Sequence, residues 1–224
     1  MRPRELFALV VTAVVLVGGF GSGLGSARTL VTSERVTIFA FPTVHERAQV
    51  VGLLGFAEGA KLNELVTIEA KECGATAFHE AFQAHIDARG GWTLQIAPTI
   101  TMTLRAVWKG TRSAAVTVQD RAWVQLSPRR RTARGFGFEV AVRAELQFWK
   151  RHIVVQRLAR DGGGWQNMKN VVLTKTGAAP GSPFVWSSAE FTTAVPRGTL
   201  VRAVLPLSQA RPCYLAGYSN QLRT

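Results

Sequence analysis

The sequence predicts an all-β fold made of two similar antiparallel sheet-on-sheet modules in tandem. Short strand-like runs alternate with glycine and proline turns at a spacing of about ten residues. After the N-terminus, no long segment has a strong helical period. Three segments of the first half recur in the same order in the second half, which indicates one β unit used twice. The matched segments are residues 66–71 with 153–158, 91–96 with 184–188, and 103–107 with 199–204.

The first unit is expected to consist of short strands throughout. Val66, Ile68 and Ala70 alternate with polar residues, which is the pattern of a strand that buries one face. Pro42 ends the first run, because proline lacks the N–H group that a sheet needs. The expected strands are residues 36–41, 49–56, 66–71, 78–86, 92–97, 103–108 and 114–118.

Residues 78–86 admit two interpretations. Phe78, Phe82 and Ile86 lie four apart, as on one face of a helix, yet they also share one face of a strand. Only Glu80 disturbs the apolar face of the strand. The strands expected on either side favour the strand interpretation.

The second unit repeats this organisation. Its first strand contains Trp123, and the glycine run at residues 162–164 marks the turn before Trp165. Residues 177–183 and 206–212 are expected to be loops. The expected strands are residues 122–126, 136–142, 153–158, 165–174, 184–194 and 199–205, with residues 214–223 closing the unit.

The N-terminus has the layout of a secretory signal peptide. Arg2 and Arg4 precede an apolar run at residues 6–17, and small residues follow up to Ala27, after which cleavage is expected. The apolar run is shorter than the ~20 residues of a membrane span. The mature protein would then be secreted or held at the cell surface without a membrane span, and an uncleaved anchor is the alternative.

The chain is strongly basic. It carries 27 lysines and arginines against 14 acidic residues, a net charge of +13 with neutral histidines, and loss of residues 1–27 would lower this to +12. Such a charge favours salt-sensitive attraction to polyanions. Outside the cell these are envelope polymers, anionic glycans and membrane surfaces, so nucleic acid is not an expected partner. The 47% share of hydrophobic residues can fill two cores and excludes a disordered chain.

Three phrases of the second unit are similar to known exported repeats: residues 155–158 (Val-Gln-Arg-Leu), 164–166 (Gly-Trp-Gln) and 214–220 (Tyr-Leu-Ala-Gly-Tyr-Ser-Asn). They resemble the tandem immunoglobulin-like or fibronectin type III-like β-sandwich repeats of exported bacterial proteins. The resemblance covers both units, better in the second, and its motifs are structural. It implies two immunoglobulin-like domains, residues 28–120 and 121–224, after a signal peptide at residues 1–27.

The two cysteines, Cys73 and Cys213, lie one in each unit, so the intradomain disulfide of antibody domains is absent. In the immunoglobulin-like strand order, residues 66–71 correspond to strand C and residues 199–205 to strand F. Cys73 then lies at the far pole of the first domain and Cys213 at the near pole of the second. A Cys73–Cys213 disulfide would join the two domains. Two unreactive thiols and an intermolecular bridge are the alternatives.

No pattern of residues predicts catalysis, a cofactor or a metal. His79 and His85 lie six apart, whereas the histidines of a zinc protease helix lie four apart. On a strand they would stand ~20 Å apart, too far for one metal ion. His45 is expected in a turn without a partner, and His152 at a strand start. The sequence contains neither a Gly-x-Ser-x-Gly elbow nor a phosphate-binding loop. We therefore do not expect an enzyme.

The densest positive charge lies at Arg129, Arg130, Arg131 and Arg134. One interpretation is a solvated loop between the first two strands of the second unit. The other is a docking site for sulfate, phosphate or carboxylate groups of an envelope polymer, because the planar guanidinium pairs bidentately with such groups.

A sugar-stacking platform is one interpretation of the tryptophans. Trp149 and Trp165 are the two expected to be exposed, because the first adjoins basic residues and the second lies at a glycine turn. The alternative is that a tryptophan anchors the core of each sandwich. Two neighbouring exposed rings would favour glycan binding, whereas buried rings would exclude it.

Together these patterns predict a non-catalytic secreted or cell-surface protein with a structural, adhesive or binding role. The expected partner is an anionic envelope polymer, a glycan or another protein. The alternative is an accessory module of an extracellular hydrolase that binds carbohydrate through exposed tryptophans. The acidic residues are scattered along the chain, which argues against a hydrolase itself.

Overall fold

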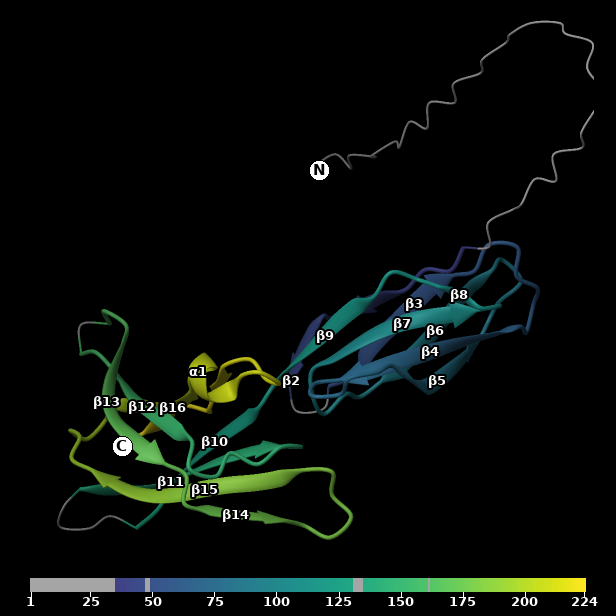
Figure 1. Ribbon diagram of the computed structural model, residues 1–224. Helices are drawn as coiled ribbons and strands as arrows, with labels where there is room; N and C mark the ends of the chain where they lie inside the picture. The colour runs from purple at the N-terminus through teal and green to yellow at the C-terminus, as the bar shows by residue number, and fades with distance from the viewer. Residues whose placement is uncertain (1–34, 47–48, 131–134, 161) are drawn as a thin grey trace, which may run out of the picture. The chain divides into compact units, whose positions relative to one another are not determined.

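Strands make up most of the folded chain (Figure 1). The computed structural model describes residues 35–46, 49–130, 135–160 and 162–224, so the expected signal peptide lies outside the described residues. The described residues form four sheets and one helix of a single turn, α1 (Leu207–Ala210). Among them, no helix has the length and apolar character that crossing a membrane requires. The prediction of an all-β fold is confirmed.

The first half of the described chain forms two sheets around one core. In one sheet the strand order is β1 (Phe39–Phe41), β3 (Val51–Phe56), β6 (Gly91–Ile96). In the other it is β2 (Val44–Glu46), β9 (Val116–Arg121), β7 (Met102–Trp108), β4 (Leu65–Glu72), β5 (His79–His85), with β8 (Thr111–Arg112) beside β7. Residues of both sheets alternate into a shared core that includes Leu53, Ile68, Trp92 and Leu104.

The second half forms another pair of sheets. In one the strand order is β10 (Trp123–Pro128), β11 (Phe136–Ala144), β15 (Val185–Thr193), β14 (Lys175–Ala178). In the other it is β13 (Trp165–Val172), β12 (His152–Leu158), β16 (Leu200–Leu205), β17 (Gly217–Tyr218), with β18 (Leu222–Arg223) also beside β16. Their shared core includes Phe138, Ile153, Leu205 and Tyr214. Each half is therefore sandwich-like.

The segments that recur in the sequence occupy corresponding strands in the two halves. Apart from Phe184 and Thr199, which come directly before their strands, the recurring residues lie in β4 and β12, in β6 and β15, and in β7 and β16. In the first half β4 pairs with β7 and β6 pairs with β3; in the second half β12 pairs with β16 and β15 pairs with β11. All four pairings are antiparallel, so similar segments make similar pairings.

A disulfide joins Cys73, which follows β4, to Cys213, which follows α1, with 5.3 Å between their Cα atoms. This confirms the predicted pairing, and no free cysteine is left. Backbone hydrogen bonds accompany it: the Thr101 amide donates to the Cys213 carbonyl, and the Leu215 amide to the Asp120 carbonyl. Ile100, from the first half, is buried in the core of the second. The link between the halves is therefore covalent, polar and apolar at once.

Residues 78–86 contain strand β5, which confirms the strand interpretation. Strands β2, β8 and β14 were not predicted. β2 has three residues and pairs in parallel with β9, too short a run to show a period. In β14, Gly177 lies where a Cβ atom would come within 2.6 Å of Trp186 Cζ2, so this glycine marks a close approach rather than a loop.

Near the C-terminus two expectations are wrong in detail. Residues 206–212, expected to be a loop, contain α1, which starts after Pro206 at φ −65°. Residues 214–223, expected to be one closing strand, contain two strands of two residues each, β17 and β18. The Cys213 disulfide and the hydrogen bond from Leu215 to Asp120 bind the start of this segment to the first half, which leaves little of it free to pair with β16.

Candidate anion-binding site

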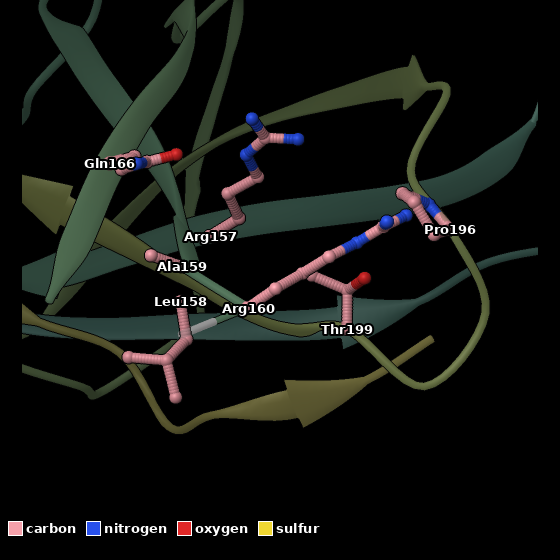
Figure 2. A pocket seen from close by; sticks show the side chains of 7 residues that line it. All are labelled: Arg157, Leu158, Ala159, Arg160, Gln166, Pro196 and Thr199. Atoms are coloured by element: carbon pink, nitrogen blue, oxygen red, sulfur yellow. The ribbon is translucent and has the colours of Figure 1, made fainter. Parts of the chain in front are cut away.

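A groove lined by arginines lies at the end of the second half where β12 ends and β16 begins. It consists of two pockets of about 430 and 410 Å³ that share part of their lining, including Arg160, Pro196 and Thr199. Arg157 lines the first pocket, and Arg197 and Arg223 line the second. We call Arg157, Arg160, Arg197 and Arg223, with the space between them, the arginine groove. Figure 2 shows Arg160 extended toward Pro196 and Thr199, while Arg157 projects separately from β12.

Strand ends and turns place these side chains around the groove. Arg157 pairs with Val201 near the end of β12 and lies on the same face as the buried Ile153 and Val155, but its own side chain is exposed. Arg160 follows the end of β12, where the Ala159 amide donates to the Gly164 carbonyl. Arg197 lies in the turn before β16, in which Gly198 has a φ of +78° that favours glycine.

The charge of the groove is not balanced by its lining. Among the described residues, no aspartate or glutamate side chain lines either pocket. Within the same part of the chain, none of the four arginines makes a salt bridge with an acidic side chain. Arg223 donates to the Gly198 carbonyl at 3.1 Å, which positions one guanidinium. Exposed guanidinium groups that line one groove, with no acidic side chain among its described lining residues, suit sulfate, phosphate or carboxylate oxygens.

The arginine loop singled out in the sequence is less favourable for an anion. Arg131 and Arg134 lie outside the described residues. Arg129 makes a salt bridge with Glu139. The pocket of about 400 Å³ beside Arg129 and Arg130 is also lined by Glu190. Acidic side chains therefore offset part of the positive charge at this loop.

Trp149 and Trp165 do not form a common platform. Trp149 precedes β12, whereas Trp165 pairs with Leu158 at the far end of that strand. The strand spans about 20 Å at 3.3 Å per residue. A cation covers each ring: Lys150 Nζ lies 4.2 Å from the centre of the Trp149 ring, and Arg202 Cζ lies 4.2 Å from that of Trp165. The two rings are thus separate cation–π sites.

The structure gives His45 a partner that was not expected. His45 lies in β2, and its Nδ1 is 3.5 Å from Oδ1 of Asp120 at the end of β9. Both side chains are buried, and within the described residues neither of these atoms has a hydrogen-bond partner. Burial lowers the pKa of His45. The pKa of Asp120 is raised to about 7, mainly by burial and also by the charges of Glu46 and Glu145, while a backbone hydrogen bond at Arg121 acts in the opposite direction.

The other histidines are surface residues, as expected. His79 and His85 are exposed on β5, and His152 is exposed at the start of β12. Within the described residues, no group of three or more histidine, cysteine, aspartate or glutamate side chains could hold a metal ion.

Pairing of strands, rather than local sequence, builds both unpredicted features. The arginine groove depends on the antiparallel pairing of β12 with β16, and the His45–Asp120 pair depends on the parallel pairing of β2 with β9. None of the models of known protein families matches the chain. A search of curated proteins also found no match.

Proposed function

We propose that this is a non-catalytic secreted or cell-surface protein that holds an anionic envelope polymer in its arginine groove. Its role would be structural or adhesive. The N-terminal pattern at residues 1–27 supports export. The Cys73–Cys213 disulfide is also consistent with an oxidising compartment.

We further propose that the two halves are immunoglobulin-like domains in tandem, residues 28–120 and 121–224. An immunoglobulin domain has strands A, B, E and D in one sheet and C, F and G in the other. The order β10-β11-β15-β14 corresponds to A-B-E-D, and β12-β16-β17 corresponds to C-F-G. In the first half β3-β6 corresponds to B-E, and β4-β7-β9 corresponds to C-F-G.

The observation that carries the polymer proposal is the unbalanced charge of the groove. Four arginines line the groove from two strand ends and two turns, and among the described residues no acidic side chain lines either pocket. The pockets adjoin, so the groove can accept more than one anionic group. A repeating polymer supplies such groups at short intervals, and each additional contact raises the effective affinity.

Binding to dextran sulfate tests this proposal, with unsulfated dextran as the neutral counterpart. The mature protein should bind the sulfated polymer in ~0.1 M salt and lose it toward ~1 M salt, where the Debye length falls to ~3 Å. The triple variant Arg157→Gln, Arg160→Gln, Arg197→Gln should bind roughly tenfold or more weakly, because charge-assisted hydrogen bonds are lost.

A second triple variant separates the groove from the net charge. Lys61, Arg89 and Arg151 are exposed elsewhere on the described chain, and changing them to Gln removes the same charge. This control should bind nearly as well as the wild type. If both triple variants lost the same affinity for dextran sulfate, binding would depend on net charge, and the groove would not be the binding site. If only the double variant Arg129→Gln, Arg130→Gln lost affinity for dextran sulfate, the binding site would be the arginine loop.

A further inference from the structure

A second pocket, separate from the arginine groove, opens on the outer face of the β10-β11-β15-β14 sheet. It has a volume of about 540 Å³. Its lining shares no residue with the groove. Aromatic side chains make up much of its wall, with a few polar groups among them. The lining residues are Asp120, Arg121, Trp123, Arg143, Ala179, Ser182, Phe184 and Trp186.

The strand register builds a row of Trp, Arg and Trp across this sheet. Trp123 of β10 pairs with Arg143 of β11, and Arg143 pairs with Trp186 of β15. Directly paired residues on neighbouring strands point to the same face of a sheet. The neighbours Val142 and Ala144 are buried in the core, so the row points outward.

Arg143 is the cation of this pocket that is available to a ligand. Its Cζ lies 4.9 Å from the centre of the Trp123 ring, which supports the guanidinium from one side. In the described part of the chain, Arg143 makes no salt bridge; Asp120 also lines the pocket, but it is buried and its Oδ1 lies 3.5 Å from His45 Nδ1. Arg121, by contrast, donates to the Ala216 carbonyl and lies near the Tyr218 ring.

Trp186 supplies an exposed aromatic surface beside Arg143. The side chain is 38% exposed. Part of its ring lies so close to β14 that only a glycine fits at position 177, where a Cβ atom would be 2.6 Å from Cζ2. The backbone of β14 therefore supports one side of the ring. The rest of the ring lines the pocket, together with Ser182 and Phe184.

We propose that this pocket binds an acidic sugar residue, a hexuronate, of a polysaccharide. The apolar C–H face of the sugar packs on Trp186, its carboxylate pairs with the Arg143 guanidinium, and its hydroxyl groups reach Ser182. A bare phosphate or sulfate would leave the aromatic walls uncovered, and a neutral sugar would leave Arg143 without an anion. The inference does not depend on the arginine groove, because the two sites share no residue.

Isothermal titration calorimetry with oligogalacturonate and the α-1,4-linked galactose oligomer of equal length tests the inference, since these sugars then differ only in having a carboxylate or a hydroxymethyl group. The acidic oligomer should bind at least about tenfold more tightly, the gain expected from a charge-assisted hydrogen bond. Arg143→Gln should abolish this preference, and Trp186→Ala should weaken both sugars. Both side chains are exposed, and thermal melting by circular dichroism will verify that the variants fold.

Matched controls keep this site distinct from the proposed polymer function. Trp149→Ala removes an exposed ring outside the pocket, and Arg151→Gln removes an exposed arginine outside it; both should bind like the wild type. The groove variant Arg157→Gln, Arg160→Gln, Arg197→Gln should also keep its affinity for oligogalacturonate. The inference would be overturned by equal affinity for the two sugars or by no binding of either. It would also be overturned if the groove variant lost affinity for oligogalacturonate while Arg143→Gln kept it.

Discussion

The two halves of the molecule use tryptophan in opposite ways. In the first half Trp92 and Trp108 are only 2% and 3% exposed and anchor the core. In the second half none of the four tryptophans is fully buried, and Phe138, Phe148 and Tyr214 fill the core instead. Similar strand pairings therefore support two different surfaces. The tryptophans that carry stability and those that are available to a ligand lie in different halves.

The outer faces of the corresponding sheets differ as well. On the β1-β3-β6 sheet, Phe39 pairs with Leu54 and both are exposed, with Phe41 and Phe56 close by in sequence. On the β10-β11-β15-β14 sheet, the corresponding face carries the row of Trp123, Arg143 and Trp186. A row of arginine between aromatic rings offers a cation beside an aromatic surface, whereas the four exposed residues of the β1-β3-β6 face carry no charge. This difference is why we place the proposed binding of an acidic sugar in the second half.

The largest expected effect comes from separating the halves. Cys73 and Cys213 are 140 residues apart in sequence. Changing both to alanine should lower the free energy of unfolding by up to about 5 kcal/mol, from the loop closure that the disulfide imposes on the unfolded chain. Urea unfolding followed by tryptophan fluorescence measures this change. Because the two halves have separate cores, the unfolding curve of the double alanine variant should split into two transitions.

The two sets of tryptophans make this experiment informative. The buried rings report mainly the first half, and the partly exposed rings report the second. The disulfide-bonded protein is the control, and its unfolding should be closer to a single transition. A double alanine variant that unfolds once, at the same urea concentration as the wild type, would show that the halves are one cooperative unit without the disulfide.

The next effect contrasts a core tryptophan with a surface tryptophan. Trp92→Ala should cost about 3–5 kcal/mol of unfolding free energy, because it leaves a large cavity in the first core. Trp149→Ala should cost less than about 0.5 kcal/mol, since the ring is 48% exposed. Denaturant unfolding of both variants measures the difference. Similar costs for the two changes would contradict the division of roles between the halves.

Much of the fold could be predicted from the sequence because its signals are local. Val66, Ile68 and Ala70 alternate with polar residues and are all buried in β4. The Cys73–Cys213 pairing followed from the strand order that the family resemblance implies. Trp92 and Trp108 anchor the first core, as the core interpretation expects, but no tryptophan does so in the second half.

The candidate sites could not be predicted, since they depend on register. Arg157 and Arg197 line adjoining pockets only because β12 and β16 are neighbours. Trp123, Arg143 and Trp186 align only in one register of three strands, although the buried residues on either side of Arg143 mark it as outward-facing. In the sequence the densest positive charge, at Arg129, Arg130, Arg131 and Arg134, stands out instead, because charge density along the chain does not show which side chains line one groove.

The pH dependence of stability tests the junction that both halves share. The pKa of Asp120 is raised to about 7 in the folded protein, so its contribution to stability is full below its ordinary pKa and is lost as the pH rises through 7. His45, whose pKa is lowered by burial, acts in the opposite direction and costs stability as the pH falls through its ordinary value. Asp120→Asn removes the first effect and retains the histidine.

Relative to Asp120→Asn, the wild type should lose about 2–3 kcal/mol of unfolding free energy between pH 5 and pH 8, at about 1.4 kcal/mol per unit of pKa shift. Chemical denaturation of both proteins at the two pH values measures this difference. Asp87→Asn is the matched control, because Asp87 is exposed in the turn before β6. A difference between wild type and Asp120→Asn that does not change with pH would contradict the raised pKa of Asp120.

The smallest effect concerns one hydroxyl group that contacts both halves. Tyr214 Oη accepts hydrogen bonds from the amides of Glu145 and Leu146, at 3.1 and 3.3 Å, and donates to the Thr99 carbonyl at 3.3 Å. Tyr214→Phe keeps the packing of the ring but removes these bonds, so it should cost about 1–2 kcal/mol of unfolding free energy. Tyr218→Phe is the control, since its hydroxyl group has no hydrogen bond to the described residues, and it should cost less than about 0.5 kcal/mol. If the two changes cost the same, the hydroxyl group does not help to join the halves, and the disulfide and Ile100 would carry that link.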